Sequence, residues 1–401
     1  MRRIATARRL AALLGAVVLV AVACSKGTPT STTPPPGTSA PATSAPAAST
    51  SAAPASVYDQ SLKGICPDPI VLQTDWFPEV EHGASYNLIG PGGTIDASAG
   101  TYSGPLKNTG VDLEIRAGGP FIGFSQPTAQ MYSKPDIFMA FADTGNQIQT
   151  YSKLPAIGVV TPLEKSPQIL MYNPAAYNFK TVSDVKQSGA TVVYFEGAAF
   201  IDYLVGTGQL DKSQLDGSYD GSPARWVSSG GKIVQQGFAT NEPYSYEHVI
   251  TDWSKPVKYL LLYDAGWTIY QSNIVVKPDT VTKYHDCLAK LVPMFQQSEV
   301  DYITNPGATN DLINSYVTKM NQFWKLSTGL DDAADKIMRD QGLVGNGSDS
   351  TIGNYDFDRL TTFFDKFASI EKANGQDIPD SLTPQDIATN EFIDPNIGLP
   401  S

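Results

Sequence analysis

The sequence predicts a parallel-sheet α/β protein that is divided into two lobes. Short apolar runs with strand character alternate with amphipathic helical patterns along most of the chain. Two such βα stretches are separated by two crossings, and the C-terminal part shows apolar residues at helical spacing. Alternation of this kind is typical of parallel sheets covered by helices, and two lobes enclose a cleft that strand-end loops line.

The N-terminus has the layout of a bacterial export signal. Arginines precede an apolar run from Leu10 to Val22 that is too short for a mature spanning helix. The small residues directly before Cys24 resemble a lipobox, so we expect residues 1–23 to be a signal peptide and Cys24 to be lipidated. Plain secretion without lipidation is the alternative. Residues 24–58 are rich in Ser, Thr, Pro and Ala and are expected to form a flexible tether.

The charge balance excludes some partners. The chain has 40 acidic and 28 basic residues, and four of the basic residues precede Cys24. Such an acidic body argues against nucleic acid or anionic lipid as the partner of the folded part. The three histidines are scattered and no CxxC occurs, so no metal site is predicted. Cys66 and Cys287 are expected to form a disulfide in an exported protein, with two free thiols as the alternative.

The first lobe is expected to comprise residues 66–174 together with 272–401. Residues 86–120 are Gly-rich and predicted to be irregular apart from one strand, with an insertion at 90–104. Ser125 is the predicted cap of the first helix, which has Pro127 in its first turn. The predicted strands of this part are 71–75, 111–116, 135–142, 156–161 and 168–172, and its predicted helices are 125–131 and 145–151.

The second lobe is expected to comprise residues 175–271, after which the chain returns to the first lobe. Its predicted strands are 191–195, 232–237 and 257–263, and its predicted helices are 181–188, 198–207 and 224–230. The returning part is predicted to hold one strand at 272–277 and helices at 280–297, 310–326, 333–339 and 357–373. The apolar stripe of the last helix is expected to pack on the body.

A first candidate site lies where the first strand stops. Pro78 cannot donate to a sheet and disfavours helix before it, which leaves five side chains near a strand's carboxyl end, where ligands of open α/β sheets bind. Aromatic side chains can stack on both faces of a flat ligand. Carboxylates can accept hydrogen bonds from ring N–H and amino groups, or form ion pairs with a cationic ligand, to which aromatic faces are also attracted. The alternatives are aromatic residues that plug the core and a histidine that bonds a loop carbonyl. The cluster consists of Asp75, Trp76, Phe77, Glu81 and His82, and all of these except Glu81 are the ligand-binding candidates.

A second candidate cluster is Asn241, Glu242 and Tyr244, where Glu242 could instead cap a helix. Asp143 and Glu196 follow predicted strands and are single candidates. No arginine lies in either cluster, so a strongly anionic ligand is disfavoured, although the segments that open at Ser125 and Gly197 could offer N–H groups. Phosphate-loop and nucleophile signatures are absent, so no catalytic residue and no cofactor is predicted.

Two motifs carry a family resemblance. Leu72-Gln73-Thr74-Asp75-Trp76-Phe77-Pro78, followed by Glu81-His82-Gly83, resembles the opening of the NMT1/THI5-like solute-binding proteins. Gly237-Phe238-Ala239-Thr240-Asn241-Glu242-Pro243-Tyr244 is similar to their Asn-Glu-Pro signature. The resemblance implies a two-lobed periplasmic-binding-protein type II fold with an interlobe ligand cleft, here with extra C-terminal helices. Its hinge would lie near residues 172–175 and 271–273, and Trp76, Asp75, His82, Asn241 and Glu242 would face the ligand.

The same resemblance implies a function. The protein would be a monomeric lipoprotein on the outer face of the cell membrane that captures a small heteroaromatic nutrient, such as a thiamine pyrimidine precursor. It would deliver this nutrient to an ABC permease and ATPase, without a cofactor and without catalysis. The alternatives are riboflavin or nitrate-, sulfonate- and taurine-type solutes, an enzyme related to pyrimidine synthase that uses His82 and a lysine such as Lys153, or a surface scaffold.

Overall fold

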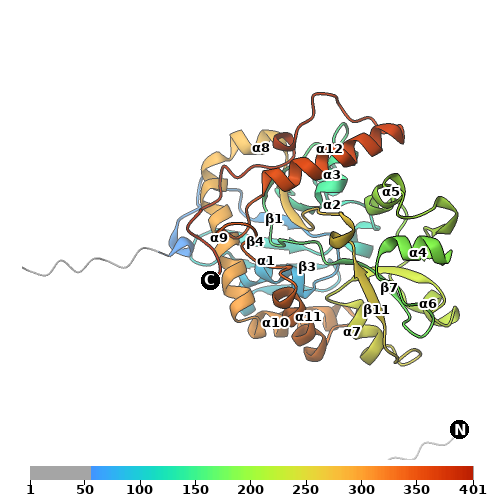
Figure 1. The fold of residues 1–401 in the computed structure, drawn as a ribbon. Coiled ribbons are helices and arrows are strands. Elements are labelled where there is room, and N and C mark those ends of the chain that lie inside the picture. Colours follow the sequence, from blue (N-terminus) through green and yellow to red (C-terminus); the bar gives the residue numbers. More distant parts are fainter. Residues whose placement is uncertain (1–55, 401) are drawn as a thin grey trace, which may run out of the picture. The chain divides into compact units, whose positions relative to one another are not determined.

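The protein folds around two β-sheets, each flanked by helices (Figure 1). The structure is a computed structural model and describes residues 56–400. The predicted signal peptide, Cys24 and nearly all of the predicted tether lie outside the described residues. Within the described range, no helix is long and apolar enough to cross a membrane.

The first sheet has seven strands in the order β2-β3-β4-β1-β5-β12-β6. At its centre β1 is buried along its whole length and pairs in parallel with β4 and β5. β12 runs antiparallel to both β5 and β6, so the sheet is mixed and the prediction of a parallel sheet was only partly right. The strands are β1 (Ile70–Gln73), β2 (Thr94–Asp96), β3 (Thr101–Pro105), β4 (Asp112–Arg116), β5 (Met139–Ala142), β6 (Ile157–Val160) and β12 (Asn273–Val276).

The Gly-rich segment before β4 contains two strands, although it was predicted to be irregular. β2 and β3 form an antiparallel hairpin that extends the sheet through β4. Tyr102 of β3 is fully buried next to Tyr86 and Tyr316, with ring centroids 6.0 and 6.1 Å away. Tyr102 also lies against Gly93, where an added Cβ would come within 2.5 Å of the phenol ring. Gly93 therefore makes room for a buried aromatic residue, which the glycine content of the segment alone did not reveal.

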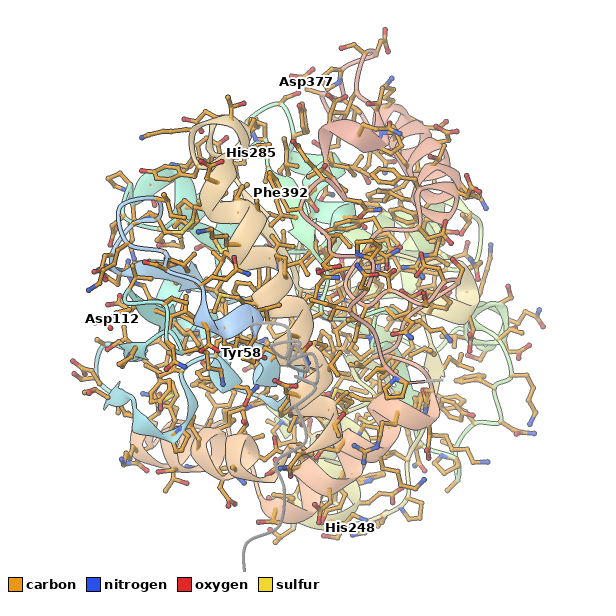
Figure 2. All side chains as sticks on the ribbon, turned by 90° about the vertical axis from the view of Figure 1, so that its left-hand side faces the viewer. Tyr58, Asp112, His248, His285, Asp377 and Phe392 are labelled. Atoms are coloured by element: carbon orange, nitrogen blue, oxygen red, sulfur yellow. A yellow bond between two sulfur atoms is a disulfide. The ribbon has the colours of Figure 1, made fainter. Side chains whose placement is uncertain are left out.

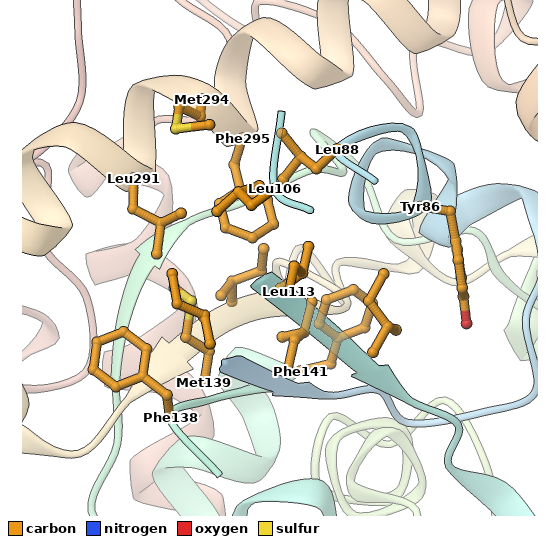
Figure 3. Packing of buried hydrophobic residues seen from close by; sticks show 14 of the residues in the cluster. Tyr86, Leu88, Leu106, Leu113, Phe138, Met139, Phe141, Leu291, Met294 and Phe295 are labelled. Carbon is orange, nitrogen blue, oxygen red and sulfur yellow. The ribbon is translucent and has the colours of Figure 1, made fainter. Parts of the chain in front are cut away.

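The core of the first lobe lies between this sheet and helix α9. Figure 3 shows Leu291, Met294 and Phe295 of α9 pointing toward Met139 and Leu113 of the sheet. All five side chains are buried, and burial of such side chains is the main favourable term in folding. This packing holds the strand that leads into the first candidate cluster.

The second sheet has five strands in the order β11-β7-β10-β8-β9. β10 pairs in parallel with β8 and antiparallel with β7, which in turn pairs antiparallel with β11. Ile169 and Met171 of β7 pack on one face with Trp226, whereas Leu170 packs on the other face with Tyr203. The strands are β7 (Gln168–Tyr172), β8 (Val192–Val193), β9 (Leu215–Asp216), β10 (Val234–Phe238) and β11 (Lys258–Leu261).

The chain crosses between the sheets at residues 161–167 and again at 262–272. The first crossing was expected near residues 172–175, but β7 already belongs to the second sheet because it pairs with β10 and β11. The pairing partners of an apolar run are set by tertiary packing, which the run does not encode.

The helices largely follow the predicted periodicity. The predicted helix at 280–297 divides into α8 and α9, and the helix that Ser125 was expected to cap begins at Pro127 without a side-chain cap. Ser125 instead donates to the carbonyl of Ile122. The helices are α1 (Gly83–Asn87), α2 (Pro127–Ser133), α3 (Thr144–Thr150), α4 (Val182–Ser188), α5 (Ala199–Gly206), α6 (Ala224–Ser228), α7 (Glu242–Tyr244), α8 (Pro278–Lys283), α9 (His285–Thr304), α10 (Gly307–Met320), α11 (Thr328–Asp340) and α12 (Phe357–Ala373).

The last helix, α12, contacts both lobes. It packs on α3, which follows β5 of the first sheet, and on α5 of the second lobe (Figure 1). Its first turn also holds the two crossings, because Arg359 pairs with Glu164 at 2.5 Å and lies 4.0 Å from the ring of Tyr270. The C-terminal part therefore does not belong to the first lobe alone.

Cys66 and Cys287 are joined by a disulfide that closes a loop across 221 positions of sequence. The bond ties the segment before β1 to the first turn of α9. Figure 2 shows the face along α9, where Tyr58 lies near the start of the described chain and His285 lies beside Phe392. Tyr58 donates a 2.6 Å hydrogen bond to Asp301 of α9. Both contacts fix the beginning of the described chain on the first lobe.

Removal of this disulfide is expected to destabilise the protein. The variant C66S/C287S should lose about 2 to 5 kcal/mol of unfolding free energy, because the unfolded chain regains the entropy of a long open loop. Thermal denaturation should show a lower Tm for the variant. Dithiothreitol should lower the Tm of the native chain and leave that of the variant unchanged, and equal Tm values in all four measurements would contradict the expectation.

Candidate functional site

The first candidate cluster lies in a loop that backbone contacts hold against the sheet. β1 ends at Gln73, and Gly118 and Gly119 donate their N–H groups to the carbonyls of Trp76 and Asp75 at 2.7 and 3.0 Å. A Cβ on Gly118 would lie 2.3 Å from the backbone of Asp75, so only glycine permits this approach. The loop is thus fixed by its backbone, and its side chains are free to serve a site.

A cavity of about 470 Å³ lies between the two sheets, next to this loop. This volume is in the range of pockets that hold small molecules. Strand ends, loops and helix starts of both lobes line it. Of the predicted site residues, the structure brings six to its wall: Asp75, Trp76, Asp143, Glu196, Asn241 and Glu242.

Aromatic rings form much of the cavity wall. The ring of Trp76 lies 5.7 Å from Phe195 of the second lobe and 5.9 Å from Phe124 at the mouth. Trp324, from the segment between α10 and α11, lies 5.7 Å from Trp76. Such walls suit a flat ligand that inserts between rings. The prediction of a ligand-facing Trp76 is consistent with this position.

Phe77 does not reach the cavity. Its side chain is 0 % exposed and belongs to the core of the first lobe, where its ring is parallel to that of Trp324 at 6.1 Å. The structure thus adopts the alternative in which Phe77 plugs the core. Because Phe77 supports Trp324 from behind, its contribution to the cavity wall is indirect.

His82 is also buried behind the cavity wall. Its Nε2 lies 3.0 Å from Asp75 Oδ1 and 3.4 Å from Glu79 Oε1. Burial alone would raise the pKa of Asp75, but the imidazole of His82 and the hydroxyl of Ser272, 2.8 Å away, hold it below its usual range. His82 therefore keeps a carboxylate ionised beside the cavity and does not contact the cavity itself.

Two further acidic residues complete this region: Glu81, which sequence analysis placed in the first cluster, and Glu79, which it did not. Glu79 lines the cavity, and burial together with the charges of Glu81, Asp75 and Glu242 raises its pKa well above the usual value. Burial raises the pKa of Glu81, which accepts a hydrogen bond from Thr240 of the second lobe. The Glu81–Thr240 bond therefore spans the two lobes. Both glutamates stand within the first motif, and their proximity to the second motif is a tertiary feature.

The second cluster contributes two of its three predicted residues. Glu242, in the first turn of α7, accepts hydrogen bonds from the backbone N–H of Phe238 at 2.6 Å and the hydroxyl of Tyr219 at 3.4 Å. Burial raises its pKa from 4.5 to about 7. Tyr244 points elsewhere, with its ring 4.6 Å from that of His248, because the helical turn rotates it away from Glu242.

Asp143 and Glu196 occupy different positions at the cavity. Asp143 caps α3 by accepting from the backbone N–H of Asn146 at 2.7 Å, and burial raises its pKa to about 6. Glu196 is exposed at the rim, between β8 and the start of α5. The amino end of α5 lines the cavity beside it and offers backbone N–H groups to a ligand acceptor.

Three buried amides also line the wall, and sequence analysis missed two of them. Gln236, Asn241 and Gln271 are 6, 8 and 7 % exposed, and of these only Asn241 was predicted. Gln236 lies on β10, and nothing in the sequence of this strand distinguishes it as a ligand-facing residue. Gln271 lies in the second crossing, which the sequence analysis had identified only as a hinge. Each amide oxygen accepts a hydrogen bond from the protein, from Phe195, Ser245 and Ser166 respectively.

The charge of the cavity wall is one-sided. Within the described residues, six carboxylic acids line it and no lysine or arginine does: Asp75, Glu79, Asp143, Glu196, Asp220 and Glu242. Asp75 and Asp220, whose pKa values hydrogen bonds hold below the usual range, carry negative charge at neutral pH. Two unit charges at 4 Å interact by roughly 1 to 4 kcal/mol in aqueous to protein-surface surroundings, so these two carboxylates would repel an anion. No group of three or more His, Cys, Asp or Glu in residues 56–400 is arranged to hold a metal ion.

The fold is that of periplasmic binding proteins, as comparison with solved structures shows. A putative sulfonate ABC transporter protein, the periplasmic sulfonate-binding protein SsuA from Methylobacillus flagellatus KT, matches at 13 % identity with a TM-score of 0.51. The match covers 82 % of this chain and 93 % of that one. The ligand-binding component of an ABC-type import system from Staphylococcus aureus, with zinc bound, matches at 10 % identity with a TM-score of 0.50, covering 81 % and 98 %. These matches confirm the predicted two-lobed α/β fold.

The comparisons do not extend to a family. No protein-family model matches the chain, and no curated protein matches it. A desulfurization enzyme is also among the structural matches, at 15 % identity and a TM-score of 0.46. Identities this low establish the fold, and the choice among ligands depends on the chemistry of the cavity.

The raised pKa values predict a stability that falls as the pH rises. Glu242 stays protonated up to about pH 7 in the folded state but ionises near pH 4.5 in the unfolded state. The unfolded state is therefore favoured increasingly as the pH rises from about 4.5 to about 7, and the free energy of unfolding falls across that range. The isosteric variant E242Q should therefore match the native chain near pH 4.5 and exceed it by up to about 3 kcal/mol at pH 8. Urea denaturation across this pH range measures the difference.

Asp365 on the exposed side of α12 provides the control. The variant D365N also removes one carboxylate and should leave the pH dependence of the unfolding free energy unchanged. An E242Q variant whose stability tracks that of the native chain at every pH would show that Glu242 is not held in an unfavourable charged state.

Proposed function

We propose that this protein is the extracytoplasmic solute-binding component of an ABC importer and captures a small heteroaromatic nutrient between its lobes. The observation that carries the proposal is the cavity between the two sheets, walled by aromatic rings and lined by hydrogen-bonding groups of both lobes. The solute would be of the thiamine-pyrimidine-precursor type, in line with the two sequence motifs. Trp76 would stack on its ring, while Glu242 and Asn241 would bind its polar edge from the second lobe.

The proposal includes the surroundings of the protein. Cys24 would carry a lipid that anchors the chain to the outer face of the cell membrane, with the tether between anchor and body. An ABC permease and ATPase would be its partners, and it would act as a monomer without a cofactor. Ligand-dependent closure of the lobes would be the state that the permease favours.

Sulfonate-type solutes are the alternative that the names of the structural neighbours suggest. The acidic wall argues against them, since a sulfonate is a permanent anion and no lysine or arginine of the described chain lines the cavity. Among the described residues, the features of the wall that would favour an anionic group are the amino end of α5 and the side-chain NH₂ groups of Gln236, Asn241 and Gln271. We therefore rank the sulfonate alternative below the heteroaromatic nutrient.

We propose binding without catalysis. An enzyme that forms a Schiff base needs a lysine in the cavity, but Lys153 is exposed on the surface and lies outside the cavity wall. His82, the other residue that the enzyme alternative would use, is buried behind the wall with Asp75 and Glu79. Neither residue stands where it could attack a bound ring.

Ligand binding is expected to alter tryptophan fluorescence and to depend on Trp76. Three of the five tryptophans, Trp76, Trp267 and Trp324, line the cavity, so a bound ring should quench emission. Titration with thiamine, its hydroxymethylpyrimidine half, riboflavin and taurine should yield saturable quenching and a raised Tm for at least one heteroaromatic compound. The variant W76A should weaken its binding by about tenfold or more, since stacking on one ring contributes roughly 1 to 3 kcal/mol.

The matched control is Y132A, which removes a half-exposed aromatic ring outside the cavity. This variant should bind the same compound with unchanged affinity. The proposal fails if none of the compounds binds, or if W76A and Y132A bind the compound equally well.

A further inference from the structure

We infer that the cavity takes a cation: a heteroaromatic solute whose positive charge resides on or beside the ring and that also presents hydrogen-bond acceptor atoms. This inference deepens the proposed function and rests on it. It is carried by three features of the same wall, namely carboxylates without a counter-charge, free amide N–H groups and aromatic faces.

The carboxylates come from both lobes and converge on one space. Asp75 and Glu79 belong to the loop and turn that follow β1, and Glu242 belongs to the second lobe. Within the described residues, His82 is the basic side chain in ion-pair distance of this group, and it reaches Asp75 and Glu79 from behind the wall. The cavity side of the carboxylates is therefore left without a positive partner, and a cation between the lobes would supply one.

The amides point to a second property of the ligand. Gln236, Asn241 and Gln271 are each more than nine-tenths buried and each has its oxygen engaged by a protein donor. For Gln236 the donor is the backbone N–H of Phe195, which fixes the orientation of the amide. Their NH₂ groups have no partner among residues 56–400, and all three residues line the cavity. Donors that line a cavity can bind an acceptor in it, which a ring nitrogen or carbonyl of the ligand would provide.

The aromatic wall is suited to a cation as well as to a ring. Trp76 reaches the cavity between Phe124 and Phe195 and stands directly after Asp75 in the chain. A tryptophan face attracts cations, and the attraction grows when the cation is removed from water. Carboxylates beside a tryptophan face thus favour an aromatic or quaternary nitrogen cation over a small, strongly hydrated ion.

The experiment compares compounds that share a ring and differ in charge. Nicotinamide, its cation methylated on the ring nitrogen, and nicotinate form one set, and thiamine with its neutral hydroxymethylpyrimidine half forms a second set. Fluorescence titration of the exported chain at neutral pH should give a Kd for the cation at least about tenfold lower than that for the neutral compound of the same set. Nicotinate should bind most weakly, and the affinity of the cation should fall with added salt.

A pair of variants separates charge from packing. E79Q keeps the shape of Glu79 and prevents its ionisation, which a bound cation would favour by lowering the raised pKa of this carboxyl group. It should therefore weaken binding of the cation at least about tenfold and leave the neutral compound within about twofold. D365N removes a distant surface charge and should change neither. Circular dichroism and the Tm of both variants establish that each is folded.

The outcomes distinguish this inference from the function on which it rests. Binding of a neutral or anionic compound as tight as that of its cationic counterpart overturns the inference and leaves the capture of a heteroaromatic solute intact. Equal losses of cationic and neutral binding in E79Q also overturn it, since Glu79 would then act through packing. If no compound of either set binds, the proposed function is contradicted together with the inference.

Discussion

The central constraint in this structure is the burial of like charges between two lobes. Asp75, Glu79 and Glu81 of the first lobe face Glu242 of the second, with His82 as their basic neighbour. The structure accommodates this arrangement through the raised pKa values of Glu79, Glu81 and Glu242 and through the Glu81–Thr240 hydrogen bond across the lobes. Ionisable groups with strongly shifted pKa values at a cavity are typical of functional sites, because binding and catalysis use groups held in unfavourable surroundings.

The remainder of the fold holds these charges in place. The mixed first sheet positions the loop after β1, and the disulfide and α9 secure the chain on either side of it. Arg359 of α12 contacts both crossings between the sheets, through Glu164 and Tyr270. The lobes are thus joined by two crossings and by a helix that packs on both, so any closure must carry α12 with it.

Sequence alone was sufficient for features that depend on local patterns. The apolar runs located β1, β7 and α12, and the abrupt stop at Pro78 located Asp75 and Trp76. Features that depend on pairing between distant segments escaped prediction: the antiparallel β12, the hairpin of β2 and β3, and the position of the first crossing. For the site, residue type predicted aromatic and acidic candidates, but tertiary packing determined which of them line the cavity. Phe77 is buried in the core, whereas Gln236 and Gln271, which residue type did not select, line the cavity.

The claim that the interlobe cavity captures a cationic aromatic solute can be tested without choosing a compound in advance. Native mass spectrometry of the protein purified from its own cells, followed by release and identification of the bound species, measures what the cavity selects. We expect one small molecule per chain, with an aromatic ring and a quaternary or protonated nitrogen. A released sulfonate, phosphate or other anion would contradict it.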